Sequence, residues 1–254
     1  MIRRPPRSTP KPSSAASDVY KRQMLALALD LFNVDKSFRD GSWENWPGLT
    51  HTKLINNEIF GKTFGIIGYG LIGQESAKRA KSLGMKVMGI NRKIKKVLPQ
   101  NLDWHGSTDE IDKLLSESDY VLLACDLNET THNLINKETL GKMKKTSFLI
   151  NIARGNVCNE NDLYNCLKNK KIAGAAIDTW WVYPYSDKEN KNPMPSNLPF
   201  HELTNLIMSP HNSSNSLESD IRRAEFMSKN FLAFKNNDEV PGFVFYGTGG
   251  KVEV

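Results

Sequence analysis

The sequence has little cysteine and no long hydrophobic run, and each absence excludes a class of protein. Its three cysteines, Cys125, Cys158 and Cys166, are an odd number without CxxC spacing. Neither a disulfide framework nor a zinc site is therefore indicated, and the cysteines are interpreted as free thiols in a reducing cytoplasm. No apolar stretch is long enough to span a membrane, and no secretory signal pattern is present. We therefore expect no metal, no membrane partner and a cytoplasmic location.

A true excess of positive charge is also missing. The chain has a net charge of +6, but residues 1–23 alone account for +5 of it. The remainder is close to neutral, so the charge gives no reason to expect nucleic acid or an anionic membrane as a partner.

Residues 1–23 resemble a translated sequencing adapter. In one reading frame, Ser13–Gln23 matches a transposase-type adapter, Met1–Thr9 matches its flow-cell end, and Pro10–Pro12 fit a sample barcode. We therefore expect a non-native, disordered leader, and Met24 need not be the natural start. The alternative is a Pro-, Ser- and Arg-rich arm that is disordered or transit-like.

The most informative stretch is GKTFGIIGYGLIGQESAKRAKSLGMKVMGINR, residues 61–92. Its hydrophobic pattern predicts a strand over Thr63–Ile67, a helix to about Ser82 and a second strand over Lys86–Ile90. The glycine-rich turn GYGLIG lies between the first strand and the helix. This order is typical of a dinucleotide-binding unit.

Each glycine of the turn has a physical reason to be glycine. Gly68 would make the tight turn, Gly70 would let the backbone approach a pyrophosphate, and Gly73 would let the helix pack on the strand. The helix N-terminus would offer its free N–H groups to the phosphates. The alternative is a glycine-rich turn without a ligand. The predicted cofactor-binding residues here are Gly68, Tyr69, Gly70, Leu71, Ile72 and Gly73.

The rest of the chain alternates apolar strands with helices. This pattern indicates an α/β fold with a doubly wound parallel sheet of the Rossmann type. Further strands are expected at Asp119–Cys125, Ser147–Ile152, Ala173–Ile177 and Leu206–Ser209. Further helices are expected at Thr108–Leu115, Lys137–Met143, Glu160–Lys168 and Leu217–Phe234. An earlier helix over residues 24–38 begins MLALALDLF and is apolar nearly all round, so a second lobe or a partner subunit must cover it.

Ligands of open parallel sheets bind beyond the carboxyl ends of the strands, so residues at those ends are the candidate site. Chemically useful side chains fall there repeatedly, which is the best sequence argument for a working site. The further predicted cofactor-binding residues at these strand ends are Asn91, Arg92, Lys93, Cys125, Asp126, Ile152, Ala153, Arg154, Asp178 and His211.

The residues after the second strand bear on the choice of cofactor. Asn91 stands where NAD-preferring folds usually carry a carboxylate that binds the ribose hydroxyls and repels a 2′-phosphate. Asn91 would not repel that phosphate, and Arg92 and Lys93 could pair with it. The sequence therefore favours NADP over NAD, unless both cations are simply solvated surface charges.

Two further residues are candidates for catalysis. The guanidinium of Arg154 suits a carboxylate and its neighbouring carbonyl oxygen, although Arg154 could instead pair with Glu160 or Asp162. The imidazole of His211 is a natural proton donor to a carbonyl that receives hydride, although a single histidine is more often structural.

Together these motifs resemble the D-isomer-specific 2-hydroxyacid dehydrogenases, from Met24 to about Phe231. The resemblance rests on GKTFGIIGYGLIG, LNETTHNLINKETLGKMKKTSFLINIARGNV, KIAGAAIDTW and NLIMSPH. It implies that Arg154 binds the substrate carboxylate, that His211 is the general acid and base, and that Asp178 contacts the nicotinamide.

The resemblance also implies a domain organisation and an assembly. Residues 24–212 would form the dinucleotide-binding domain. Residues 213–254 would be a C-terminal helix and tail returning to the remnants of a second, smaller substrate domain. The family is usually homodimeric, and MLALALDLF is similar to the helix at its dimer interface. The N-terminal half of the substrate domain would be missing, so the chain could bind cofactor yet turn over poorly.

One residue departs from the family pattern. Most members carry a Glu before a Pro that orients the catalytic histidine, whereas here Tyr183 precedes Pro184. A tyrosine supplies no carboxylate to stabilise the charged histidine. As the pH rises, we therefore expect activity to be lost at a lower pH than in a Glu-containing relative. Glu202 is a possible stand-in, and we include it among the candidate catalytic residues.

The sequence thus predicts an NAD(P)-dependent oxidoreductase that reduces a small 2-oxo acid, such as glyoxylate or hydroxypyruvate, or oxidises the 2-hydroxy acid. One alternative is a non-catalytic nucleotide-binding module that regulates a partner, which Tyr183 mildly favours and the pair Arg154 and His211 disfavours. Another alternative is an inactive fragment.

Overall fold

The computed structural model describes residues 13–41, 57–92, 94, 97–184, 194–212, 215–238 and 240. Within these ranges lies one seven-stranded sheet, in which all neighbouring strands are parallel. Along the sheet the strands are β3 (Trp104–Gly106), β2 (Lys86–Ile90), β1 (Thr63–Ile67), β4 (Tyr120–Leu123), β5 (Phe148–Asn151), β6 (Gly174–Ile177) and β7 (Leu206–Met208). The order reverses between β1 and β4, so the expected doubly wound α/β fold is confirmed.

The strands are continuous apolar runs because both faces of the sheet are covered. Successive side chains of a strand point to opposite faces. In β4, Val121 and Leu123 join one hydrophobic core, whereas Tyr120 and Leu122 join the other. An alternating pattern would have left one face exposed to water, and neither β4 nor β5 has an exposed residue.

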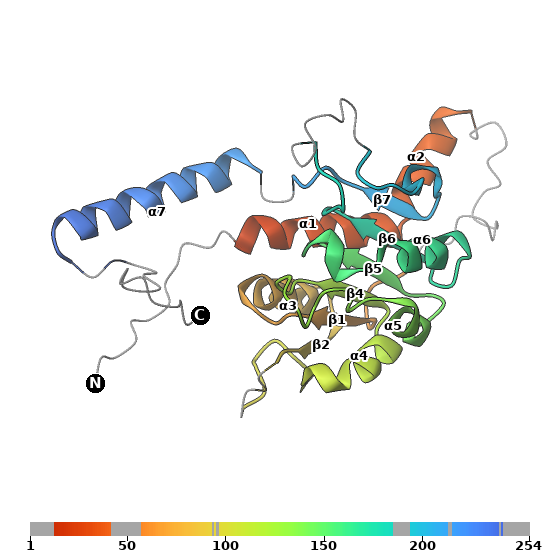
Figure 1. Cartoon of the computed structure of the whole chain (residues 1–254), viewed down its shortest axis with the longest axis horizontal. Coiled ribbons are helices and arrows are strands. Elements are labelled where there is room, and N and C mark those ends of the chain that lie inside the picture. The colour runs from red at the N-terminus through yellow and green to blue at the C-terminus, as the bar shows by residue number, and fades with distance from the viewer. Residues whose placement is uncertain are drawn as a thin grey trace.

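Two layers of helices enclose the sheet (Figure 1). Helices α1 (Ser13–Ala28) and α3 (Leu71–Ser82) lie together and contribute to one core. Helices α4 (Ile111–Glu117), α5 (Lys137–Lys142) and α6 (Glu160–Lys168) contribute to the core on the opposite face. The predicted helices here are confirmed, except that the one expected from Thr108 opens with a 3-10 turn over Thr108–Glu110.

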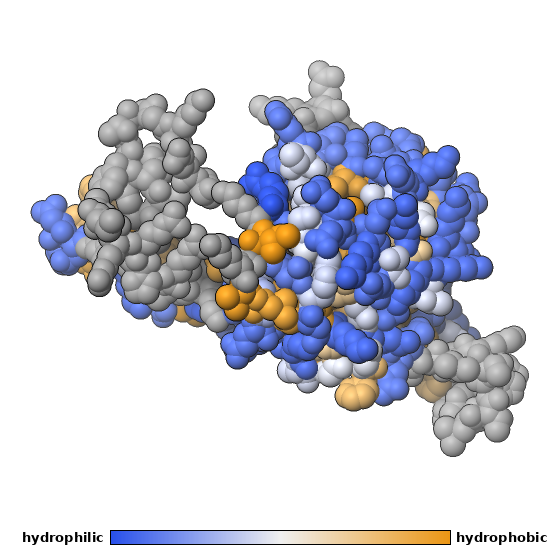
Figure 2. Space-filling view, turned by 90° about the horizontal axis from the view of Figure 1, so that it is seen from below, coloured by the Kyte–Doolittle hydropathy of each residue, from blue (hydrophilic) through white to orange (hydrophobic). Residues whose placement is uncertain are grey.

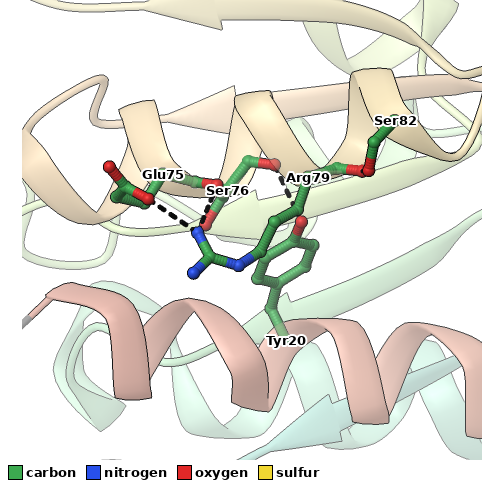
Figure 3. Close-up of polar contacts among 5 residues, drawn as sticks. All are labelled: Tyr20, Glu75, Ser76, Arg79 and Ser82. Atoms are coloured by element: carbon green, nitrogen blue, oxygen red, sulfur yellow. Dashed lines mark hydrogen bonds and ion pairs between the residues drawn. The ribbon is translucent and has the colours of Figure 1, made fainter.

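The expectation of a disordered leader is wrong for Ser13–Gln23, because these residues form the first part of α1. Tyr20 is fully buried, and its hydroxyl donates a hydrogen bond of 2.8 Å to the carbonyl oxygen of Ser76 in α3. Figure 3 shows the Tyr20 ring reaching from α1 to α3. Beside it, Arg79 of α3 forms an ion pair of 2.8 Å with Glu75. Residues 1–12 lie outside the described ranges.

The expected helix over residues 24–38 is divided into two helices. Helix α1 ends at Ala28, and α2 (Leu31–Arg39) begins after Asp30, whose φ of 48° is left-handed and interrupts the helix. Met24 and Leu27 are buried within this chain, whereas Phe32 and Phe38 of α2 are exposed. The second part of the predicted apolar helix, α2, is therefore the part without a buried residue.

Helix α7 (Leu217–Lys235) projects away from the sheet (Figure 1), and several of its apolar side chains, including Phe231 and Phe234, are exposed. Elsewhere the surface is more polar: Figure 2 shows a mainly hydrophilic face with hydrophobic side chains in small groups. Among the described residues, no helix has both the length and the apolar character needed to cross a membrane.

Candidate active site

The glycine-rich turn adopts the backbone that its sequence predicts. Gly68 follows β1 with a φ of +98°, and a Cβ there would lie 2.6 Å from the backbone nitrogen of Cys125. A Cβ on Gly73 would collide with the carbonyl oxygen of Gly68. Neither collision can be relieved by moving a flexible side chain, so both positions require glycine for the fold itself.

Gly70 is different, because a Cβ on it would meet nothing within 4 Å. Gly70 is the N-cap of α3, and no side chain caps this helix end. The first N–H groups of a helix have no partner within it, so they are available to an anion. The open space over Gly70 and the uncapped helix end both fit a dinucleotide pyrophosphate, with Leu71 and Ile72 in the first turn.

Replacing Gly70 by alanine is expected to weaken dinucleotide binding at least about tenfold while leaving the fold intact. Its φ of −82° suits alanine, but the added methyl group would occupy the space needed by the phosphates. Titration of NADPH fluorescence and thermal unfolding measure the two effects. Gly141→Ala is the matched control, because its Cβ also meets nothing within 4 Å. Equal affinity in Gly70→Ala and wild type would contradict this site.

Asn91 holds the glycine-rich turn. Its Oδ1 accepts a hydrogen bond of 2.6 Å from the Tyr69 backbone N–H, and its Nδ2 donates one of 3.2 Å to the Tyr69 carbonyl oxygen. Both ends of the amide are therefore used within the protein. The sequence placed Asn91 among the cofactor-binding residues, at the position of the usual ribose-binding carboxylate, and the structure gives it a supporting contact within the turn. Arg92 is exposed beside it, and Lys93 lies outside the described residues.

The residues that follow β4 lie against the glycine-rich turn, where the Cys125 backbone is next to Gly68. Cys125 is free, and burial raises the pKa of its thiol to about 11. The thiol is therefore neutral at physiological pH and adds no negative charge beside a phosphate site. Asp126, which follows it, is exposed.

Arg154 lies in a loop after β5 that Asn151 organises. The Asn151 side chain is fully buried, donates to the Arg154 carbonyl oxygen at 3.0 Å and accepts from the Ala153 N–H at 3.0 Å. Ile152 and Ala153 are buried, whereas Arg154 is exposed. Its Nη1 donates to the Ala153 carbonyl oxygen at 2.6 Å. Asn151 was not among the predicted residues, although a polar residue within the apolar run SFLINI is a usable signal.

The alternative partners of Arg154 are occupied elsewhere. Glu160 accepts hydrogen bonds from Ser196 and from the Asn197 N–H, and Asp162 accepts from the Lys137 N–H at 2.9 Å. No ion pair among the described residues joins Arg154 to either carboxylate. Its guanidinium therefore remains available at the carboxyl edge of the sheet.

Asp178 follows β6 and is fully buried. Its Oδ1 accepts a hydrogen bond of 2.6 Å from the Ser209 hydroxyl, and Ser209 in turn accepts from the Gln23 side chain at 3.2 Å. Its Oδ2 is buried with no hydrogen-bond partner among the described residues. Burying a carboxylate oxygen without a hydrogen-bond donor costs free energy. This oxygen is therefore suited to accept a hydrogen bond from a ligand, such as the amide of a nicotinamide.

His211 follows β7 and has a left-handed φ of 52°. Its Nδ1 lies 2.8 Å from the Tyr183 hydroxyl oxygen, which also accepts a hydrogen bond of 3.2 Å from the Trp180 N–H. The Trp180 Nε1 donates to the Ser209 carbonyl oxygen at 2.8 Å, two residues before His211. The segment after β6 therefore holds the segment after β7 in place.

The structure does not bring Glu202 to His211. Glu202 lies in a 3-10 turn (Phe200–Glu202), and its Oε1 is 4.0 Å from Nε2 of its neighbour His201. No hydrogen bond or ion pair within the described ranges joins Glu202 to His211. The structure therefore gives no contact that supports Glu202 as a stand-in for the family glutamate, and the turn after β6 brings Tyr183 to the histidine instead.

Fold and site define a dinucleotide-binding α/β protein with a set of polar groups along one sheet edge. Residues 22–213 match the family model described as "D-isomer specific 2-hydroxyacid dehydrogenase, NAD binding domain". The chain belongs to this family, and the predicted resemblance is confirmed.

Individual relatives agree with the family assignment. The chain is 36% identical over 233 residues to a glyoxylate reductase of Pyrococcus horikoshii, covering 91% of this chain and 66% of that protein. Among solved structures, an acyclic imino acid reductase in complex with NADPH and D-Arg is similar with a TM-score of 0.74 and 26% identity, covering 92% of this chain and 69% of that one.

A second solved structure is an NAD complex. It is the D-isomer specific 2-hydroxyacid dehydrogenase of Lactobacillus delbrueckii ssp. bulgaricus, with a TM-score of 0.73, 25% identity and coverage of 89% of this chain and 68% of that one. The chain thus spans about two thirds of the length of the proteins that it matches.

Proposed function

We propose that the protein transfers a hydride between NAD(P)H and a small 2-oxo acid, with glyoxylate or hydroxypyruvate as the preferred substrate class. The observation that carries this proposal is a set of groups at one sheet edge. They are the open space and uncapped helix end at Gly70, which we call the phosphate cradle, the buried Oδ2 of Asp178 without a partner among the described residues, the exposed guanidinium of Arg154 and the imidazole of His211. The name of the P. horikoshii relative supports the substrate class.

Each group has a distinct role in this proposal. When bound, the reduced nicotinamide supplies the hydride equivalent for the carbonyl carbon. Asp178 orients the nicotinamide amide, and Arg154 binds the substrate carboxylate and stabilises the charge that develops on the carbonyl oxygen. His211 donates a proton to that oxygen in reduction and removes it in oxidation.

Oxidation of NADPH and NADH in the presence of a panel of 2-oxo acids tests the proposal. We expect absorbance at 340 nm to fall only when a 2-oxo acid is present, and the 2-hydroxy acid to accumulate in equal amount. Cofactor binding without turnover of any acid in the panel would contradict it and favour the non-catalytic binding module.

NADPH is expected to bind at least about tenfold more tightly than NADH. The residue Asn91 carries no charge to repel a 2′-phosphate, and Arg92 is exposed next to it, where a charge-assisted hydrogen bond is worth about 1.5–3 kcal/mol. Arg92→Ala should remove most of the preference, whereas Lys142→Ala, which changes an exposed cation on α5, should not. Fluorescence titrations compare the affinities, and tighter binding of NADH to the wild type would contradict the preference.

We also propose a homodimer that forms through α2. Support comes from Leu31 and Phe32, which are apolar and exposed at the start of this helix and are the last two residues of the segment that resembles the family's interface helix. A cytoplasmic location is proposed as well, which the free thiols of Cys158 and Cys166 support.

A further inference from the structure

We propose that Tyr183 is the positioning residue of His211 and takes the place of the carboxylate that most family members use there. This inference rests on the proposed function, because it assigns a partner to the histidine that would exchange the proton. It concerns a residue at which this chain departs from its family.

The contact is specific in both distance and direction. The Tyr183 hydroxyl oxygen lies 2.8 Å from His211 Nδ1. The centroids of the two rings are 5.6 Å apart, and the angle between the ring planes is 56°. Tyr183 is half-buried, and the residue after it is Pro184, which restricts the backbone conformation of Tyr183. A hydroxyl fixed against Nδ1 leaves Nε2 as the nitrogen that exchanges a proton with the substrate.

The Trp180 N–H favours donation by the hydroxyl. It donates to the Tyr183 oxygen at 3.2 Å, so one lone pair of that oxygen is occupied. The hydroxyl proton can then be donated to Nδ1 of the neutral ring, which places the ring proton on Nε2. When the ring gains a second proton, Nδ1 becomes a donor and the hydroxyl must turn to accept it. A carboxylate partner needs no such turn, because it only accepts.

The two partners therefore differ in how they treat the charged ring. A carboxylate stabilises imidazolium by charge, whereas a neutral phenol supports both ring states by hydrogen bonding alone. No ion pair of His211 is present among the described residues, and Glu202, the acidic group of the segment before β7, lies beside His201 instead. Reduction of the 2-oxo acid needs the charged ring, so its rate falls as the pH rises. This loss should begin at a lower pH than it would with a carboxylate partner.

The first test is nitrogen-15 NMR of the full chain labelled at histidine, without substrate, with His211 assigned by the signals lost in His211→Ala. We expect the neutral wild-type ring to be mainly the Nε2–H tautomer. Tyr183→Phe should lose this bias, and Tyr183→Glu should reverse it to Nδ1–H because the carboxylate accepts that proton. Tyr164→Phe, which removes a hydroxyl on α6, is the matched control. A wild-type tautomer unchanged by Tyr183→Phe would overturn the proposal.

The second test is the pH dependence of 2-oxo acid reduction. Tyr183→Glu should move the loss of activity at high pH upward by about one pH unit or more, as expected for a new opposite charge beside the ring. Tyr183→Phe should lower kcat about threefold to tenfold with unchanged cofactor affinity, a loss equivalent to one hydrogen bond. Glu202→Gln should leave the profile unchanged. Identical profiles for all variants would overturn the positioning role.

The two tests distinguish a failure of the positioning role from a failure of the proposed function. The tautomer is measured without turnover, so a wild-type Nε2–H ring with no reduction of any acid would contradict the proposed function and still support the hydrogen bond. If the wild type reduced a 2-oxo acid but the His211 tautomer did not change in the Tyr183 variants, the inference would be overturned and the proposed function would stand. Unfolding temperatures of the variants confirm that each is folded.

Discussion

Replacing His211 by alanine is expected to lower the turnover of a 2-oxo acid by about 10²–10⁴-fold, the usual contribution of a positioned general acid. The affinity for NADPH should be unchanged, because the phosphate cradle at Gly70 lies on β1 and α3 rather than on β7. Steady-state kinetics with glyoxylate and NADPH, together with fluorescence titration of NADPH, separate the two quantities.

His201→Ala is the matched control for this substitution. His201 precedes β7, whereas His211 follows it, and among the described ion pairs His201 contacts only Glu202, so the variant should retain wild-type turnover. Full activity in His211→Ala would remove the proton-transfer role. An equal loss in both variants would indicate a general structural effect instead.

Replacing Tyr20 by alanine is expected to lower the free energy of unfolding by about 3–5 kcal/mol, the range for large aromatic residues in a core. The Tyr20 ring is fully buried between α1 and α3, packs on Phe64 with ring centroids 5.1 Å apart, and its hydroxyl binds the Ser76 carbonyl oxygen. Chemical denaturation followed by circular dichroism measures the change.

Two variants define what the Tyr20 result means. Tyr20→Phe keeps the ring and removes the hydrogen bond, so it should cost only about 1 kcal/mol. Phe234→Ala removes an exposed ring on α7 and should change stability by less than about 0.5 kcal/mol. If Tyr20→Ala were as stable as wild type, residues 13–23 would behave as the disordered leader that their sequence suggests.

The local elements could be predicted from the sequence because their signals are local. Strands β1 and β2 begin and end where the apolar runs begin and end, and α3 ends at Ser82 as expected. The short edge strand β3 was not predicted. Its three residues, Trp-His-Gly, have no strand pattern, and their order depends on pairing with β2.

Contacts between distant segments were predicted less well. The composition of Ser13–Gln23 gave no hint that Tyr20 fits between α3 and the sheet. The use of Asn91 to hold Tyr69 was not foreseen, since a pattern identifies the residue at a strand end but not the direction of its amide. Ser209 was missed because it acts on Asp178 rather than on a ligand.

The departure at Tyr183 was visible in the sequence, but its consequence was not. The sequence shows that a carboxylate is missing and offers Glu202 as the nearest replacement. Only the path of the chain after β6, held by the Trp180 side chain on Ser209, brings the Tyr183 hydroxyl to His211. Chemistry at a site depends on such long-range geometry, which a single sequence does not encode in any short motif.

Transfer of deuterium in a single turnover tests the central claim most directly. The protein, in excess over glyoxylate, is mixed with NADPH deuterated at nicotinamide C4, and the product is analysed by mass spectrometry. The proposed function predicts glycolate that carries deuterium at C2 from the wild type, and far less from His211→Ala. Wild-type protein that binds NADPH but yields no deuterated glycolate or other 2-hydroxy acid would contradict it.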